Sequence, residues 1–168
     1  MARRFKNQLA GQIGEHLVVA ELGRLGIVAT PFSGNVPDID VLAYKDGKSV
    51  PIQVKANRIG DISVDAKRYL DIQFDGNLQT VTGKSSSIDR NLIFIMVGIG
   101  KKAGEDRFFI YKQGFLQDLI YENHTKFLKK HGGVRPRNPQ STHCAYNERD
   151  LAGTEGDWSV VIEALGTR

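Results

Sequence analysis

Residues 39–56, IDVLAYKDGKSVPIQVKA, decide the fold that this sequence predicts. Two runs of alternating apolar and polar residues flank the dipeptide Asp46-Gly47, which favours a tight hairpin turn because both positions tolerate a positive φ. Pro51 lacks a backbone N–H, so part of the second run must lie at a sheet edge or lack a ladder hydrogen bond. The stretch therefore predicts a β-hairpin.

The expected register gives this hairpin one apolar and one polar face. Side chains alternate along a strand, so one face carries apolar residues alone: Ile39, Val41, Ala43, Val50, Ile52 and Val54. On the other face, Asp40 lies opposite Gln53 and Asp38 lies opposite Lys55. We expect the apolar face to pack inward, which leaves these four polar side chains together at the end away from the turn.

Helical and extended segments surround the hairpin. Apolar residues recur at helical spacing within 5–26, and the expected inward stripe comprises Leu9, Ile13, Leu17, Ala20 and Leu25. Further along, we expect a strand at 27–32, short strands or a helical turn within 60–90, strands at 91–98 and 108–111, a helix at 114–130, a loop at 132–141, and a strand or short helix at 157–165. The pattern predicts an α/β fold with a central mixed sheet flanked by helices.

Length and composition limit the class of protein. The chain has 168 residues, of which 40% are hydrophobic and 25% charged, and this balance predicts one globular domain over residues 1–168 and excludes collagen, coiled-coil and wholly disordered classes. A single cysteine, Cys144, excludes an internal disulfide and a zinc site built from cysteines. No stretch reaches the roughly 20 apolar residues that a membrane span needs. We expect a cytoplasmic protein with no membrane partner.

The basic residues concentrate in one segment. The net charge is only +4, but residues 124–137, HTKFLKKHGGVRPR, contain no acid and include Lys126, Lys129, Lys130, Arg135 and Arg137. A charge run of this kind is either a solvated helix end that leads into a loop or a patch that contacts phosphates. The spacing of His124, His131, His143 and Cys144 matches no standard zinc module, which favours surface histidines or phosphate contacts.

The polar end of the hairpin has the composition of a magnesium site. Carboxylate oxygens and an amide carbonyl suit a hard divalent cation, whose bound water becomes a nucleophile and whose charge offsets the charge that develops on a phosphate. A lysine two residues further along the same face can orient that water or stabilise the scissile phosphate. The structural alternative is a solvated face with weak cross-strand charge pairs.

Three motifs in this order resemble the PD-(D/E)XK, or restriction-endonuclease-like, nuclease superfamily: Glu15 in GQIGEHLVVAEL, Asp40 in DIDVLAY and Gln53-Val54-Lys55 in PIQVKA. The resemblance covers roughly residues 9–57. It implies an α/β nuclease core in which Asp40, Gln53, the Val54 carbonyl and Glu15 bind Mg²⁺ or Mn²⁺, and Lys55 assists hydrolysis of DNA. Gln53 replaces the commoner acid, which predicts weak metal affinity.

Several alternatives stay open at this point. Asp38 follows Pro37 and is the reserve for Asp40. On a helical wheel, Glu21 lies within the apolar stripe and Glu15 only at its margin, so the wheel does not select Glu15. RNA is an alternative substrate, and the alternative function is a nucleic-acid-binding or assembly subunit that keeps the fold without cleaving. In the enzyme hypothesis, the basic helix and loop within 114–141 hold the DNA backbone. A cut through both strands requires a second active site, which a homodimer would provide.

Overall fold

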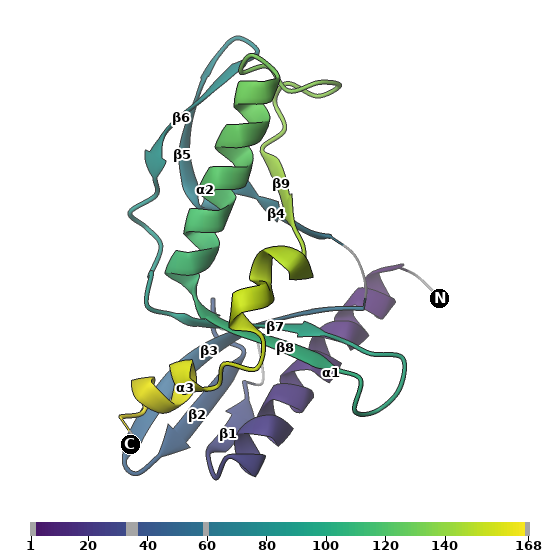
Figure 1. Ribbon diagram of the computed structural model, residues 1–168, viewed down its shortest axis with the longest axis vertical. Helices are drawn as coiled ribbons and strands as arrows, with labels where there is room; N and C mark the ends of the chain where they lie inside the picture. The colour runs from purple at the N-terminus through teal and green to yellow at the C-terminus, as the bar shows by residue number, and fades with distance from the viewer. Residues whose placement is uncertain (1–2, 33–36, 59–60, 167–168) are drawn as a thin grey trace. The chain divides into compact units, whose positions relative to one another are not determined.

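The computed structural model describes residues 3–32, 37–58 and 61–166, which divide into two compact units (Figure 1). The first unit takes its described residues from 1–60, 92–112 and 151–168, and the second from 61–91 and 113–150. The expected hairpin lies in the first unit, and the basic segment lies in the second.

A mixed sheet forms the centre of the first unit. Its strands are β1 (Val28–Pro31), β2 (Val41–Lys45), β3 (Lys48–Asn57), β7 (Ile93–Gly98) and β8 (Arg107–Lys112), in the order β1-β2-β3-β7-β8. Strands β3 and β7 are parallel, and the other neighbouring pairs are antiparallel. The helices α1 (Arg3–Arg24) and α3 (Ser159–Ala164) flank this sheet. The predicted fold class, a central mixed sheet with flanking helices, is confirmed.

The predicted hairpin is present with the predicted register. Strand β2 pairs with β3 from Val41↔Ile52 to Lys45↔Lys48, and the turn places Asp46 at φ 50° and Gly47 at φ 81°. The inward residues Val41, Ala43 and Ile52 are fully buried. Pairing of β3 with β7 begins only at Ile52. Pro51 therefore lies where β3 has a neighbour on one side alone, as its missing N–H requires.

Helix α1 turns a different face inward from the one predicted. Its buried residues, four apart in sequence, are Ala10, Gly14, Val18 and Leu22. Leu9 and Leu25, which the pattern assigned to the inward stripe, are 39% and 38% exposed. The helix approaches β3 so closely that a Cβ built on Gly14 would lie 2.5 Å from the Cβ of Ala56. Where α1 meets β3 most closely, a small residue is therefore required on the inward face, because a larger one at position 14 would hold the helix away.

The C-terminal segment is a short helix, which decides between the two expected alternatives. Val161 and Leu165 join the buried cluster that contains Val18 of α1 and the inward residues of the sheet. Trp158, just before α3, packs against Phe108 with ring centroids 5.6 Å apart. The tryptophan therefore anchors the end of the chain to β8.

The second unit combines one long helix with two short antiparallel ribbons. Helix α2 (Gln113–Lys130) accompanies β4 (Ile62–Asp65) paired with β9 (His143–Tyr146), and β5 (Leu70–Asp75) paired with β6 (Leu78–Lys84). The short 3-10 turn η1 (Ala66–Arg68) also belongs to this unit, and the 3-10 turn η2 (Glu148–Thr154) runs from the second unit into the first. Strand β9 was not predicted. Across the described residues, no helix combines the length and apolar character that crossing a bilayer demands.

One buried side chain joins α2 to the ribbon of β5 and β6. The amide of Gln117 donates to the carbonyl oxygens of Tyr69 at 2.8 Å and Ser85 at 2.9 Å, and its oxygen accepts from Arg90 at 2.6 Å. Each polar atom of this buried amide is thus paired, which is how a glutamine is accommodated in a core.

Candidate active site at the hairpin

Asp40 is held at the end of the hairpin by both its backbone and its side chain. Its N–H donates to the carbonyl of Ile52 at 3.0 Å, and its carboxylate Oδ2 accepts from the N–H of Val54 at 2.7 Å. The carboxylate thus takes the place of the backbone carbonyl that a neighbouring strand would offer to the Val54 N–H. Sequence reasoning proposed the Val54 carbonyl as a ligand but missed this N–H, although the register that it used places both groups together.

The carboxylates of Glu15 and Asp40 interact electrostatically. It follows Gly14 on α1, at the point where the helix contacts β3 most closely, and its side chain is half-buried. Burial raises the pKa of the Glu15 carboxyl above its usual 4.5, the negative charge of Asp40 raises it further, and His16 acts in the opposite direction. The fold therefore holds two carboxylates near enough to repel each other. Glu21, the alternative on this helix, instead forms an ion pair with Arg24.

The raised pKa of Glu15 predicts that Glu15→Gln makes the protein more stable at neutral pH. A carboxyl with a raised folded pKa binds a proton more tightly in the folded state, so stability falls as pH rises from 4.5 through the folded pKa. Glutamine keeps the shape and removes the charge. Thermal unfolding should show a higher Tm for Glu15→Gln at pH 7 and a shrinking difference as the pH falls toward 4.5.

The matched control for this measurement is Glu21→Gln on the same helix. This change removes the partner of Arg24, so the Tm at pH 7 should stay the same or fall slightly. A Tm gain for Glu15→Gln that is equal at both pH values would contradict a raised pKa of the Glu15 carboxyl.

Gln53 and Lys55 lie on β3 next to Asp40, on the face opposite to Val54 and Ala56, which contact α1. Gln53 is half-buried and Lys55 is exposed. Among the described residues, no hydrogen bond or ion pair joins either side chain to Asp40 or Glu15. The structure thus brings Asp40, Glu15 and Val54 together and places Gln53 and Lys55 alongside them.

Asp38, the reserve for Asp40, has a different environment. It is exposed, its backbone φ is +62°, and it precedes the first residue of β2 by three positions. The carboxylate that bonds to the hairpin backbone belongs to Asp40. Geometry therefore favours Asp40 as the carboxylate at the end of the hairpin.

The donor set at the hairpin fits a magnesium ion that keeps several waters. In the part of the chain that the structure describes, no three His, Cys, Asp or Glu side chains form a ready cage for a metal. Magnesium is usually bound through one or two carboxylates plus waters and substrate phosphates, so a full protein cage is not required. Asp40 and Glu15 offer two carboxylates whose mutual repulsion a cation would relieve, and Gln53 and Val54 offer neutral oxygens.

The predicted basic residues of the second unit do not share one environment. Lys126, Lys129 and Lys130 are exposed on the last turns of α2, and Arg137 is exposed in the following loop. Arg135 is only half-exposed, because its guanidinium lies over the ring of Phe127, 4.6 Å from the centroid. Four of the five side chains are thus available to solvent, and Arg135 is packed against the unit.

His124 is buried, which corrects its interpretation as a surface histidine. It lies on α2 between Ile120 and Leu128, each four residues away and each buried. The same four-residue spacing is visible in the sequence and would have placed His124 on the inward face of the helix.

Comparisons with known proteins identify the architecture. No protein-family model matches the chain, and no curated protein matches it in sequence. A bacterial homing endonuclease has a similar structure, with a TM-score of 0.50 and 12% identity over 93% of this chain and 93% of its own. A Holliday junction resolvase from the archaeal hyperthermophile Archaeoglobus fulgidus has a TM-score of 0.46 and 11% identity over 94% of this chain and 97% of its own. With its hairpin-centred mixed sheet, the chain has a restriction-endonuclease-like fold.

Proposed function

We propose that this chain is a divalent-metal-dependent nuclease that hydrolyses phosphodiester bonds of DNA at the hairpin. The observation that carries the proposal is the Asp40 carboxylate, fixed by the Val54 N–H at 2.7 Å beside the half-buried Glu15. A fold shared with a homing endonuclease supports nucleic acid as the substrate.

Each residue of the candidate site has a distinct role in this proposal. Asp40 and Glu15 hold Mg²⁺ or Mn²⁺, with neutral oxygens from Gln53 and the Val54 carbonyl as further ligands. When bound, the ion supplies a nucleophilic water near neutral pH and offsets charge on the scissile phosphate. The exposed Lys55 ammonium donates hydrogen bonds to the attacking water or to phosphate oxygens.

The hydrolysis is a substitution at phosphorus. The oxygen of water forms a new bond to phosphorus, and one of the two bridging P–O bonds breaks. Water loses a proton to the solvent, and the leaving oxygen takes one up. Glutamine at position 53 gives the site one negative charge fewer than glutamate would, so metal affinity depends mainly on Asp40 and Glu15.

The basic residues of the second unit supply affinity for the nucleic-acid backbone. Lys126, Lys129, Lys130 and Arg137 are exposed and would neutralise phosphates, with Arg135 beside them. Contacts of this kind carry no sequence information and weaken as salt rises. A cut through both strands requires two hairpin sites, so we propose a homodimer for that reaction.

The experiment that tests the proposal is cleavage of supercoiled, linear, single-stranded and branched DNA, with RNA in parallel, in Mg²⁺ or Mn²⁺. We expect cutting that EDTA abolishes and that Lys55→Met lowers by about 10²-fold. Lys48→Met is the matched control, because Lys48 is exposed on the same strand at the turn end of the hairpin. An equal loss in both variants would contradict a specific role for Lys55.

The second candidate function is a nucleic-acid-binding subunit that does not cleave. Two observations favour it: Gln53 stands where an acid is commoner, and the described residues contain no three-ligand metal cluster. Under this alternative, DNA binds equally well in Mg²⁺ and in EDTA, and no substrate is cut. The same set of assays therefore separates the two functions.

A further inference from the structure

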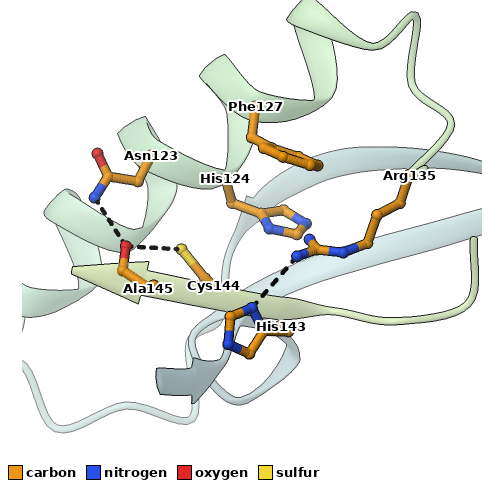
Figure 2. Close-up of a pocket in the computed structure, with 7 residues that line it drawn as sticks. All are labelled: Asn123, His124, Phe127, Arg135, His143, Cys144 and Ala145. Atoms are coloured by element: carbon orange, nitrogen blue, oxygen red, sulfur yellow. Dashed lines mark hydrogen bonds between the residues drawn. The ribbon is translucent and has the colours of Figure 1, made fainter. Parts of the chain in front are cut away.

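A pocket of about 250 Å³ lies within the second unit, where α2, β9 and the loop between them meet (Figure 2). Its walls are largely apolar, from Phe127, Cys144 and Ala145. Its polar groups are few and come from different elements: His124 on α2, Arg135 in the loop and His143 on β9. Ligand sites commonly combine an apolar cavity with a few converging polar groups.

His124 is the unexplained group in this pocket. The residue is 1% exposed, and neither ring nitrogen has a hydrogen-bond partner. Its ring projects from α2 toward the guanidinium of Arg135 (Figure 2). Buried polar side chains are nearly always paired, so an imidazole with both nitrogens unpaired indicates a missing partner.

Arg135 is held in place beside His124. Its guanidinium lies 4.6 Å from the centroid of Phe127, and its Nη2 donates to His143 Nδ1 at 3.3 Å. Because that nitrogen accepts, His143 Nε2 carries the proton and donates to Ser63 Oγ at 3.0 Å. Among the described residues, no carboxylate lies within ion-pair distance of Arg135. The guanidinium is therefore oriented, and its other N–H groups are available to a ligand.

The charge balance of the pocket favours an anion. Burial lowers the pKa of His124, the positive charge of Arg135 lowers it further, and Asp65 acts in the opposite direction. Burial raises the pKa of the Cys144 thiol, so this group stays neutral near pH 7. The pocket thus presents the Arg135 cation next to a His124 imidazole whose neutral form is favoured. A negative ligand would pair with the first and favour protonation of the second.

We propose that this pocket binds an oxyanion of the phosphate class, held by the guanidinium of Arg135 and the imidazole of His124. The site is independent of cleavage at the hairpin. Exposed lysines on the same helix, Lys126, Lys129 and Lys130, raise the local concentration of anions. A phosphate reaches the pocket either as the free ion or as the terminal phosphate of a polynucleotide, and the two sources share the same tetrahedral oxyanion.

The direct test is NMR of the histidine rings in the full chain, which has only four histidines. Inorganic phosphate is titrated at constant ionic strength, and the titration is repeated at several pH values. We expect a saturable shift of the His124 ring and a higher His124 pKa in the bound state. If one proton is taken up, affinity rises by up to about tenfold for each pH unit of acidification. No shift of His124 up to about 20 mM phosphate would overturn the proposal.

Two variants distinguish binding of phosphate in the pocket from general electrostatic attraction of phosphate to the surface. Arg135→Gln should abolish saturation, whereas Arg149→Gln makes the same substitution at an exposed position of the second unit outside the pocket and should leave it unchanged. Equal losses in both variants would overturn the proposal. His124→Gln changes a buried residue, so a loss of binding in that variant would not separate the loss of a ligand group from a loss of folding. The test therefore relies on the wild-type titration and on Arg135→Gln, because Arg135 is half-exposed.

The source of the phosphate is decided with a short single-stranded oligonucleotide, with and without a 5′-phosphate, in EDTA. A terminal phosphate that binds in the pocket should tighten binding about tenfold, and Arg135→Gln should remove this preference. Equal binding of the two oligonucleotides, together with a His124 shift in inorganic phosphate, identifies the free ion as the ligand. Because no cleavage is involved, failure of the proposed nuclease activity leaves each outcome readable.

Discussion

Asp40→Asn is expected to abolish cleavage, with a fall in rate of about 10³-fold, in a protein that remains folded. Asparagine retains a side-chain oxygen that can accept from the Val54 N–H, the bond that the carboxylate makes at 2.7 Å. It removes the negative charge that a divalent cation needs. The variant therefore separates the structural role of this side chain from its role as a ligand. Cleavage assays measure the loss of rate, and calorimetric titration with Mg²⁺ measures the loss of metal binding.

Asp38→Asn is the matched control for this prediction. The two substitutions remove the same charge from residues two positions apart, and asparagine tolerates the φ of +62° that Asp38 adopts. Asp38→Asn should cut DNA at the wild-type rate. Loss of cleavage in Asp38→Asn with retention in Asp40→Asn would move the ligand to Asp38 and contradict the geometry of the hairpin.

A second readout follows from the repulsion between Asp40 and Glu15. Removing the Asp40 charge should shift the pKa of Glu15 back toward 4.5, leaving the effect of burial and the opposite effect of His16. NMR titration of the Glu15 carboxyl measures this shift without any assay of activity. An unchanged Glu15 pKa would show that the two carboxylates are farther apart than the structure places them.

The hairpin could be predicted from the sequence because its determinants are local. Asp46-Gly47 fixes the turn, and the alternation of residues on either side fixes the register. The same register predicts that Asp40 lies opposite Gln53. Glu15 is different, because the helical wheel places Glu21 within the apolar stripe and Glu15 only at its margin. Only the resemblance to a nuclease superfamily selected it.

The parts that sequence patterns missed depend on contacts between distant residues. Hydrophobicity assigned Leu9 to the inward face of α1, yet Leu9 is exposed and the close contact with β3 is made at Gly14. Strand β9 has only four residues, and its partner β4 lies far back in the chain, with Asp65 paired to His143. A strand this short carries too little alternation to be identified alone, so its existence becomes evident only through its partner.

Gly14→Ala and Gly11→Ala are expected to change stability in opposite directions, although both make the same substitution in one helix. A Cβ at Gly14 would lie 2.5 Å from the Cβ of Ala56, so α1 must shift away from β3, at a cost of about 1–3 kcal/mol in the free energy of unfolding. A Cβ at Gly11 meets nothing within 4 Å. There, the helix propensity of alanine should add about 0.5–1 kcal/mol. Urea unfolding at pH 7 measures both changes in the free energy of unfolding.

The Gly14 contact also bears on the candidate site, because the next residue is Glu15. A shift of α1 away from β3 separates Glu15 from Asp40, so Gly14→Ala should reduce cleavage as well as stability, while Gly11→Ala leaves cleavage unchanged. Ala56→Gly removes the atom that the new methyl group meets, so the double variant should recover much of both losses. A double-mutant cycle measures this coupling. Purely additive effects would mean that α1 does not contact β3 at this point, and that the position of Glu15 is set elsewhere on the helix.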